Sequence, residues 1–330
     1  MAENEKSVNT GVIPKLVHCF LSGNLKFALT PAEINELSWI GQEKFIKSTI
    51  HNPICKKYPL RHDFCRLFIK KVIEYLEPYQ EIHDDIFEFL CTQMKSKFDK
   101  DNLFYRHTIV NNDISNIITI KETNNMVING TTGMKTWEAA IMLSDWILGN
   151  RELFNNKKVL ELGSGVGFTG ITLAKFCSPK SIMMTDCHID VLKVLIENIA
   201  INFPKLEKKE TSQCTCFRSE EKEIGVMMLD WNCIKDINDS QNPDIIIGAD
   251  IVYDPSILQP LCNVFETFFK RNPKVQIYIA SIIRNEETFS TFLNILGRIN
   301  VAVEEHVLTD CMYLKWDQEM PRCLLKINQN

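Results

Sequence analysis

A glycine-rich segment, Gly163-Ser-Gly-Val-Gly167, directly follows the apolar run Val159–Leu162, and Glu161 stands just ahead of it. Glycines let backbone N–H groups approach a ligand closely, and a helix that begins behind them offers its positive N-terminal end. The run from Gly165 to Gly170 also matches G-x-G-x-x-G, the dinucleotide fingerprint, which is a weak signal when it stands alone. The segment therefore predicts a site for a nucleotide-containing cofactor.

Two kinds of cofactor fit the glycines, and Glu161 separates them. A dinucleotide brings a pyrophosphate, which a carboxylate at this position would repel. S-adenosylmethionine brings an amino group and a sulfonium, which the same carboxylate would attract. We therefore expect S-adenosylmethionine and not a nicotinamide dinucleotide, so that a methyltransferase is favoured over an oxidoreductase.

Acidic side chains also follow three further apolar runs. Asp186 ends SIMMTD, where it can accept hydrogen bonds from ribose hydroxyls. Asp230 and Trp231 end the run IGVMMLD, where the carboxylate can accept from an adenine amino group and the indole can pack on the ring. Asp250 ends PDIIIGAD, three residues before Tyr253. Because ligands of open α/β sheets bind outside the carboxyl ends of the strands, these side chains and Glu161 should face one crevice.

The elements that would carry these residues alternate along the chain from residue 157. Strand-like runs are KKVLELG, SIMMTD, IGVMMLD, PDIIIGAD and VQIYIAS, and helical stretches cover 168–177, 188–202, 256–271 and 286–298. Continuous apolar strands are typical of a parallel sheet buried on both faces, and the alternation indicates a doubly wound α/β domain. VAVEEHVL and RCLLKIN predict two more strands that form an antiparallel edge, whereas 204–223 is predicted to be a solvent loop without chemistry.

Residues 1–105 carry a different pattern, which predicts a helical domain ahead of a catalytic domain over 106–330. Thr30-Pro31-Ala32-Glu33 is a capping box, and an apolar stripe follows it at Ile34, Leu37, Ile40 and Phe45. Further helices are predicted over 64–79 and 84–98, with a connecting loop over 51–59. No catalytic motif occurs here, so packing or partner binding is the expected role.

Between the two domains, residues 103–130 read as a small β meander of the runs FYRHTIV, IITIKE and MVIN. A helix is then predicted from Trp137 to Gly149, with Thr136 as its N-cap.

Composition excludes several classes of protein. The net charge of −5 over 330 residues is unfavourable for binding bare nucleic acid, and no apolar stretch is long enough to span a membrane. The polar start MAENEKSVNT is not a secretory signal, and the twelve cysteines are scattered. Cys214 and Cys216 lack partners for a zinc site, so we expect no metal. A cytoplasmic monomer with reduced thiols is the expected state.

The motifs together resemble a known family. VLELGSGVG from Val159, TDCH from Thr185, LDW from Leu229 and ADIVY from Ala249 resemble the protein-lysine branch of the seven-strand, Rossmann-like class I methyltransferases, which carries Asp-x-x-Tyr after the fourth strand. GTTGMKTWEAA from Gly130 is similar to the N-terminal motif of that branch. HNPICKK and CRLF, from His51 and Cys65, resemble the N-terminal domain of the elongation factor 2 lysine methyltransferases.

This resemblance implies roles for individual residues and a substrate. It places Asp250 and Tyr253 at the catalytic centre, and it implies elongation factor 2 as the protein substrate, recognised by the N-terminal domain. Cofactor contacts are implied for Trp137, Gly163, Ser164, Gly165, Asp186, Trp231 and Ala249. Enzymes that methylate adenine or amide nitrogens typically carry Asn/Asp-Pro-Pro-aromatic where this chain has Asp-Ile-Val-Tyr, which favours an amine.

Methylation of a lysine constrains the chemistry further. The amine, whose free pKa is about 10.4, must lose a proton before it attacks, and burial beside a cationic sulfonium lowers its pKa. We expect Asp250 to orient the amine and Tyr253 to shape its channel, while the group that removes the proton stays open. A methyltransferase of another protein or a small amine, and a non-catalytic binding protein with this fold, are the alternatives.

Overall fold

The computed structural model describes residues 11–95, 103–233, 242–308 and 311–330, which form two compact units that meet in sequence at Lys121 and Glu122. The expectation about MAENEKSVNT and the end of the helix predicted over 84–98 fall outside the described residues. The division falls 16 residues after the boundary that the sequence predicted at residue 105. Ile109 and Ile117 of the predicted meander pack against the helices of the first unit, and so belong to its core.

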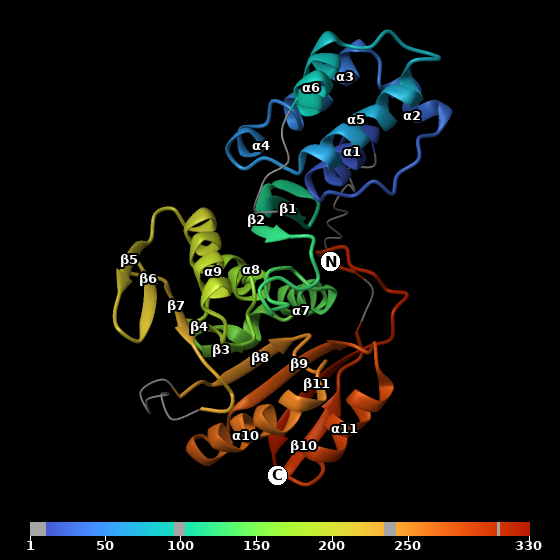
Figure 1. The fold of residues 1–330 in the computed structure, drawn as a ribbon. Helices are drawn as coiled ribbons and strands as arrows, with labels where there is room; N and C mark the ends of the chain where they lie inside the picture. The colour runs from blue at the N-terminus through green and yellow to red at the C-terminus, as the bar shows by residue number, and fades with distance from the viewer. Residues whose placement is uncertain (1–10, 96–102, 234–241, 309–310) are drawn as a thin grey trace, which may run out of the picture. The chain divides into compact units, whose positions relative to one another are not determined.

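The first unit contains six described helices and a β-hairpin, shown in blue to green in Figure 1. The helices are α1 (Val12–Leu21), α2 (Pro31–Glu36), α3 (Trp39–Ser48), α4 (Pro53–Lys57), α5 (His62–Leu76) and α6 (Asp84–Lys95). The strands β1 (Leu103–Val110) and β2 (Asp113–Thr123) form a two-stranded sheet. Their shared core is built on Phe20, Phe45 and Phe68, whose rings lie edge-on or stacked 5.2–6.4 Å apart.

The capping box at Thr30 is confirmed, because its hydroxyl accepts from Glu33 N while the Glu33 carboxylate accepts from Thr30 N. Of the apolar stripe predicted behind it, Ile34, Leu37 and Phe45 are buried in the core, whereas Ile40 is not. The chain breaks between α2 and α3, and Ile40 is 63% exposed. Gly41 permits the close approach of α3 to the end of α2, since a β-carbon there would lie 2.2 Å from the carbonyl oxygen of Glu36. The predicted loop over 51–59 contains the short helix α4, which Asn52 caps.

The second unit is built on one twisted sheet of nine strands in the order β10-β11-β9-β8-β3-β4-β7-β6-β5 (Figure 1). Five neighbouring strands are parallel and match the five predicted apolar runs: β3 (Lys158–Leu162), β4 (Ser181–Asp186), β7 (Glu223–Met228), β8 (Ile245–Ala249) and β9 (Gln276–Ile282). The chain runs outward from β3 through β4 to β7, then returns to β8 on the other side of β3. That reversal creates a topological switch point between β3 and β8.

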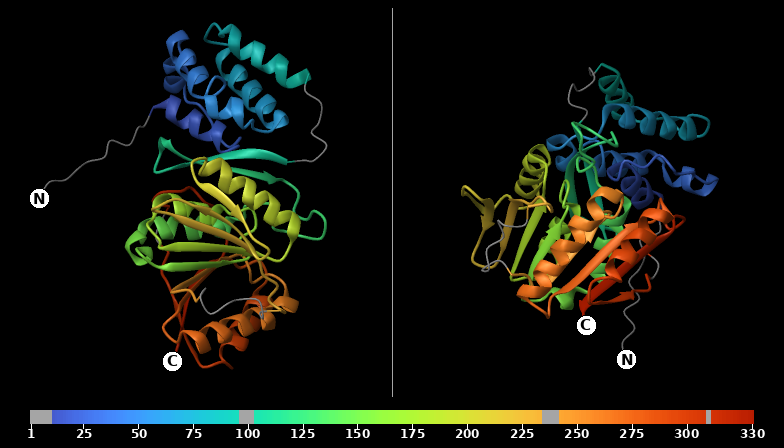
Figure 2. Two further views of the ribbon diagram at one scale, coloured as in Figure 1. Left: turned by 90° about the vertical axis from the view of Figure 1, so that its left-hand side faces the viewer. Right: turned by 60° about the horizontal axis from the view of Figure 1, so that its bottom comes forward.

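Helices cover both faces of this sheet, as Figures 1 and 2 show. One face carries α7 (Glu138–Gly149), α8 (Phe168–Phe176) and α9 (Ile189–Asn202), and the opposite face carries α10 (Pro255–Arg271) and α11 (Glu286–Leu296). A short 3-10 turn, η1 (Arg151–Phe154), leads into β3. These helices confirm the predicted ones to within two residues at each end. The resulting architecture is the Rossmann-like doubly wound fold that was predicted.

The two predicted terminal strands are confirmed, and they form the antiparallel edge of the sheet. β10 (Val301–Glu305) lies at the edge, and β11 (Arg322–Gln329) inserts antiparallel between β10 and β9. The predicted loop 204–223 is wrong: it forms β5 (Glu207–Glu210) and β6 (Cys214–Arg218), an antiparallel hairpin that extends the sheet beyond β7. The polar composition of this segment did not predict strands, because β5 is exposed along its whole length and therefore has no apolar residues at alternate positions.

Two local predictions before α7 also need correction. MVIN is not a third strand, since it contributes only an isolated bridge between Ile128 and Thr131. The N-cap of α7 is Trp137 and not Thr136, whose backbone N–H donates to the buried Glu122 carboxylate. None of the described helices is long and apolar enough to cross a membrane.

Candidate active site

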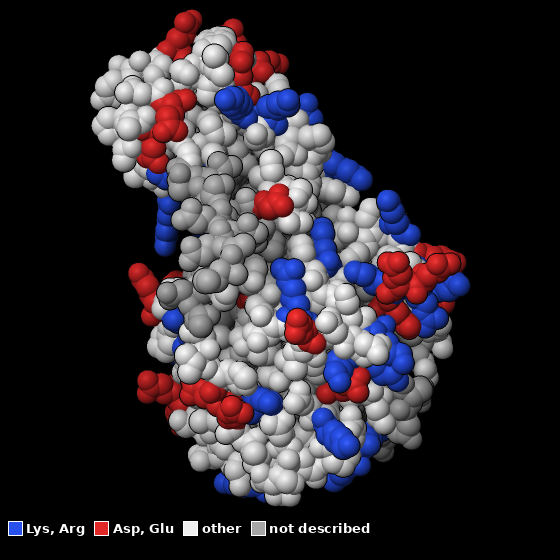
Figure 3. Space-filling model, turned by 180° about the vertical axis from the view of Figure 1, so that it is seen from behind, with Lys and Arg blue, Asp and Glu red and all other residues white. Residues whose placement is uncertain are grey.

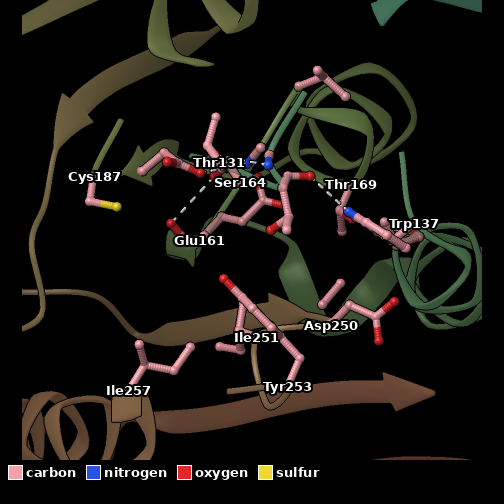
Figure 4. A pocket seen from close by; sticks show the side chains of 18 of the residues that line it. Thr131, Trp137, Glu161, Ser164, Thr169, Cys187, Asp250, Ile251, Tyr253 and Ile257 are labelled. Carbon is pink, nitrogen blue, oxygen red and sulfur yellow. Dashed lines mark hydrogen bonds between the residues drawn. The ribbon is translucent and has the colours of Figure 1, made fainter. Parts of the chain in front are cut away.

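A cavity of about 360 Å³ lies at the carboxyl ends of β3, β4 and β8, beside the switch point. All eleven side chains or glycines that the sequence singled out line it: Trp137, Glu161, Gly163, Ser164, Gly165, Asp186, Asp230, Trp231, Ala249, Asp250 and Tyr253. In Figure 4, Glu161 and Ser164 lie on one side of the cavity, and Asp250, Ile251 and Tyr253 lie across from them. The structure therefore brings the predicted residues together.

The glycine loop between β3 and α8 is shaped by positions that no larger residue can occupy. Gly163 and Gly165 have φ angles of 61° and 53°, in the left-handed region. A β-carbon on Gly163 would lie 2.7 Å from Ile251 Cγ2, and one on Gly165 would lie 2.9 Å from the carbonyl oxygen of Gly133. The loop therefore packs against the Ile251 side chain and the Gly133 backbone, with no room for a side chain at either glycine.

Hydrogen bonds tie this loop to the end of β4. Ser164 N donates to the carbonyl oxygen of Thr185 at 2.7 Å, and Thr185 N donates back to Ser164 Oγ at 3.0 Å. Asp186 accepts from Gly165 N and His188 N with its two carboxylate oxygens. Burial raises the pKa of Asp186, and these backbone donors oppose that rise. Since each carboxylate oxygen has two lone pairs, Asp186 can still accept hydrogen bonds from a ligand.

Glu161 is the buried carboxyl of the cavity. Its side chain is 3% exposed, and its Oε2 has no hydrogen-bond partner among the described residues. Burial raises its pKa to about 8, although the Ser164 hydroxyl and the Gly170 N–H nearby lower it in part. A buried acceptor without a donor is costly for the fold.

The adenine side of the cavity is formed by residues that follow β7. Asp230 closes a turn by accepting from the backbone and side-chain nitrogens of Asn232 at 2.9 and 3.0 Å. Trp231 is half-buried and packs against the core beneath the sheet. The pair thus offers a carboxylate beside an aromatic side chain in the cavity wall.

Asp250 is held in an unusual way. Its φ angle is 55°, and its side chain is 5% exposed. Arg284, beyond the end of β9, donates from both terminal guanidinium nitrogens to the two carboxylate oxygens, at 3.3 and 3.0 Å. Ile282 N donates to Oδ1 at 3.1 Å. The aspartate that the sequence assigned to catalysis is therefore the partner of an ion pair.

Trp137 joins the two sides of the cavity mouth. Its indole N–H donates to the carbonyl oxygen of Thr132 at 2.9 Å, which fixes the ring. Two cations lie over that ring: Arg284 at 5.1 Å and Lys135 at 5.4 Å from its centroid. Sequence reasoning missed both cations. Lys135 could have been found, because it precedes the tryptophan in the quoted motif, but Arg284 carries no local signal.

No group of three or more His, Cys, Asp or Glu side chains with metal-binding geometry occurs within the described ranges. The Sγ atoms of Cys214 and Cys216 lie 3.5 Å apart on β6, remote in sequence from the residues of the cavity.

A doubly wound sheet with a glycine loop and carboxylates at successive strand ends defines a class I methyltransferase. Residues 115–299 match the family model described as Lysine methyltransferase, which is more than half of the chain, so the chain belongs to that family. The human Protein-lysine N-methyltransferase EEF2KMT is 28% identical over 294 residues, covering 86% of this chain and 84% of the relative. The Protein-lysine N-methyltransferase EFM3 of Chaetomium thermophilum is 32% identical over 187 residues, covering 56% and 53%.

The cofactor of this protein-lysine methyltransferase is S-adenosylmethionine, and the cavity fits it on its own chemistry. The Glu161 carboxyl in the cavity wall suits the amino group, the remaining lone pairs of Asp186 suit ribose hydroxyls, and Asp230 with Trp231 suits adenine. No pyrophosphate could lie against the buried Glu161 carboxyl without repulsion once that group ionises.

Proposed function

We propose that this protein-lysine methyltransferase acts on elongation factor 2 and works in the cytoplasm. The observation that carries the proposal is the reach of the likeness to EEF2KMT. It covers 86% of the chain, more than residues 115–330 can supply, so it extends well into the helical unit. The family model, in contrast, covers only residues 115–299. The likeness to EEF2KMT thus includes the unit whose motifs resemble the elongation factor 2 enzymes.

The helical unit has the properties of a recognition module. It has its own apolar core around Phe20 and Phe68, yet it exposes large apolar side chains on its surface. Trp39, Ile40 and Tyr79 are 42%, 63% and 71% exposed. Exposed aromatic side chains of this kind are enriched at protein interfaces, and a folded substrate needs contacts well beyond the reacting lysine.

The charge distribution also supports a protein substrate. Basic and acidic side chains intermix among the described residues on the face in Figure 3, and the whole chain carries a net charge of −5.

The cysteines support the proposed cytoplasmic location. All twelve cysteines are free thiols, as expected in a reducing compartment.

The proposed mechanism assigns each side of the cavity one task. When bound, S-adenosylmethionine supplies a methyl group on a sulfonium. Glu161 and Asp186 hold the donor, and Tyr253, 51% exposed at the mouth, forms one wall of the amine channel. S-adenosylmethionine bound here would supply the methyl group for an in-line displacement by the neutral amine, which Asp250 and Tyr253 would orient.

Alignment is the main contribution that the protein can make to such an in-line displacement. Asp250 accepts a hydrogen bond from the amine and so points the lone pair toward the methyl group. This role requires only one free acceptor site on the carboxylate, and the ion pair with Arg284 leaves one.

The test is methyl transfer from labelled cofactor to purified, intact elongation factor 2, followed by mapping of the modified residue. Label on one lysine with the wild-type chain, and a strongly reduced rate of labelling with Asp250→Asn, is the expected result. A chain of residues 122–330 keeps the second core and should bind cofactor but methylate the intact factor poorly. Label that stays in a lysate after the factor has been depleted would contradict the proposed substrate.

A further inference from the structure

The two hydrogen bonds from the Arg284 guanidinium to the Asp250 carboxylate, here called the fork, change the charge that a substrate amine would meet. The Asp250 carboxylate is almost entirely buried, and Arg284 supplies a full positive charge against its negative one. Arginine keeps that charge at every relevant pH and matches a carboxylate with two parallel donors. The pair is therefore electrically neutral where it meets the cavity.

The lone pairs of Asp250 can be counted. A carboxylate offers about four acceptor sites, two on each oxygen. Oδ1 accepts from Ile282 N and from one guanidinium nitrogen of Arg284, and Oδ2 accepts from the other guanidinium nitrogen. One site remains, on Oδ2. Asp250 can thus take a single N–H from a substrate amine, although it has no unbalanced charge with which to hold an ammonium.

Arg284 is fixed in this position by Trp137. The guanidinium carbon lies 5.1 Å from the centroid of the indole, and the indole is itself anchored through its N–H to Thr132. A guanidinium stacked on an aromatic face keeps its plane, which a lysine ammonium would not do. The ring thereby orients the fork that faces Asp250.

We propose that Arg284 is a positioning residue of methyl transfer: it balances the charge of Asp250 and leaves one acceptor site on Oδ2, so that Asp250 receives the neutral form of the substrate amine and not the ammonium. The inference rests on the proposed role of Asp250 at the amine. It matters because only the neutral amine has a lone pair for attack, and a bare carboxylate beside it would favour the protonated form.

Other charged groups around the cavity set the background against which this effect is measured. The titratable side chains that line it, besides Asp250, are Lys135, Glu161, Asp186, Cys187, Asp230 and Tyr253. Lys135 stacks on the same indole as Arg284, at 5.4 Å, and no hydrogen bond or ion pair between Lys135 and Asp250 is found in the described part of the chain. Substitution of Lys135 therefore removes a cation from the Trp137 ring without removing the ion-pair partner of Asp250, which makes it a control for substitution of Arg284.

The experiment measures single-turnover methyl transfer as a function of pH, with enzyme saturating over substrate, because rates in the complex report groups in the complex. The substrate is intact elongation factor 2 or, if the wild-type chain does not label it, the protein that it does label in a lysate. The rate should rise with pH as the amine loses its proton, and we call this part of the pH–rate profile the rising limb. In Arg284→Met, the rising limb should move to higher pH by about one unit or more, as expected for an uncompensated opposite charge near an amine.

Three variants separate charge from packing. Arg284→Lys keeps the charge without the fork, so its limb should stay near that of the wild type while the plateau rate falls. Lys135→Met removes a cation from the same indole, and its limb should move by less than half as much. The double variant Asp250→Asn/Arg284→Met has no carboxylate to compensate, so the limb should return to the wild-type position or below. Calorimetric cofactor affinity serves as the check on folding.

The result that overturns the inference is a plateau rate reduced in Arg284→Met with the limb unmoved, which is what a merely structural contact would give. A limb that moves equally in Lys135→Met would also overturn it. If Asp250→Asn methylates at the wild-type rate, the proposed role of Asp250 fails first. If Asp250→Asn loses activity but the limb of Arg284→Met stays in place, only the role of Arg284 fails.

Discussion

Gly170 in α8 lies directly over Glu161 in β3: a β-carbon at position 170 would be 2.5 Å from Glu161 Oε2. The third glycine of the G-x-G-x-x-G match therefore serves helix–strand packing around a buried carboxyl. Met184 closes the same space, with its Cε 2.6 Å from that imagined β-carbon. The Glu161 carboxyl and the glycine that makes room for it are thus one structural unit.

Gly170→Ala should consequently weaken both the fold and the site. The added methyl group must displace Glu161 or Met184, and overpacking of this kind costs about 1–3 kcal/mol. Denaturant unfolding and calorimetric titration with S-adenosylmethionine measure the two effects. Gly297→Ala is the matched control, since its φ is −64° and its nearest contact is 3.5 Å, so it should change neither by much. Equal behaviour of the two variants would contradict the packing role of Gly170.

Glu161 should make stability depend on pH in a defined direction. Its folded pKa of about 8 lies above its ordinary value of 4.5, because burial penalises the charged form. Its contribution to the free energy of unfolding is therefore full below about pH 4.5 and is lost as the pH rises toward 8. The slope for one such group is at most about 1.4 kcal/mol per pH unit.

Unfolding measured between pH 5 and pH 8 in the absence of cofactor tests this. Glu161→Gln should reduce the slope without abolishing it, since burial raises the pKa of Asp186 in the same direction. Cofactor binding at pH 7 should release up to about one proton in the wild type and less in the variant, because a cationic amino group favours the ionised carboxylate. Calorimetry in buffers of different ionisation enthalpy detects the difference. An unchanged slope in Glu161→Gln would show that Glu161 does not titrate in this range.

The sequence predicted the parallel core of the sheet and the residues around its switch point because those signals are local. Apolar runs such as Ile245–Ala249 and the glycines after Leu162 need no information from elsewhere in the chain. The β5–β6 hairpin escaped because the exposed residues Glu207–Glu210 lack the alternation of a half-buried strand. Ile40 was misplaced because the spacing of the apolar residues does not reveal the break between α2 and α3.

Arg284 shows the same limit at the site itself. Its partner Asp250 is 34 residues away, and only the parallel pairing of β8 with β9 places the ends of those strands together. A cation two residues beyond a strand end is too common to predict a function. The sequence could therefore indicate which carboxylate faces the cavity, whereas the arginine that pairs with this carboxylate could be identified only from the fold.

Gly163→Arg should abolish cofactor binding, because any side chain at that position enters the space between Ile251 and Trp231. Gly163→Ala should weaken binding for the same reason, with an added strain of about 1–2 kcal/mol from its left-handed backbone. Gly23→Ala isolates the strain, since Gly23 has a φ of 69° but no atom within 4 Å of the added carbon. Both alanine variants should lose stability, and only the one at 163 should lose affinity in calorimetry. Undiminished binding by Gly163→Arg would place the cofactor elsewhere.

Substitutions of Asp250 and Tyr253 should lower turnover far more than cofactor affinity, since both are assigned to the amine. Asp250→Asn is a cleaner variant than Asp250→Ala, because asparagine tolerates the φ of 55° and alanine does not. We expect its rate to fall by about 10²–10³-fold, within the range that positioned polar groups contribute, with the dissociation constant of the cofactor changed by less than about threefold. Tyr253→Ala should act in the same direction with little loss of stability, because half of its side chain is already in solvent. Single-turnover rates and calorimetry on the same preparations give the two numbers. Affinity that falls in proportion to rate would move these residues to the cofactor side of the cavity.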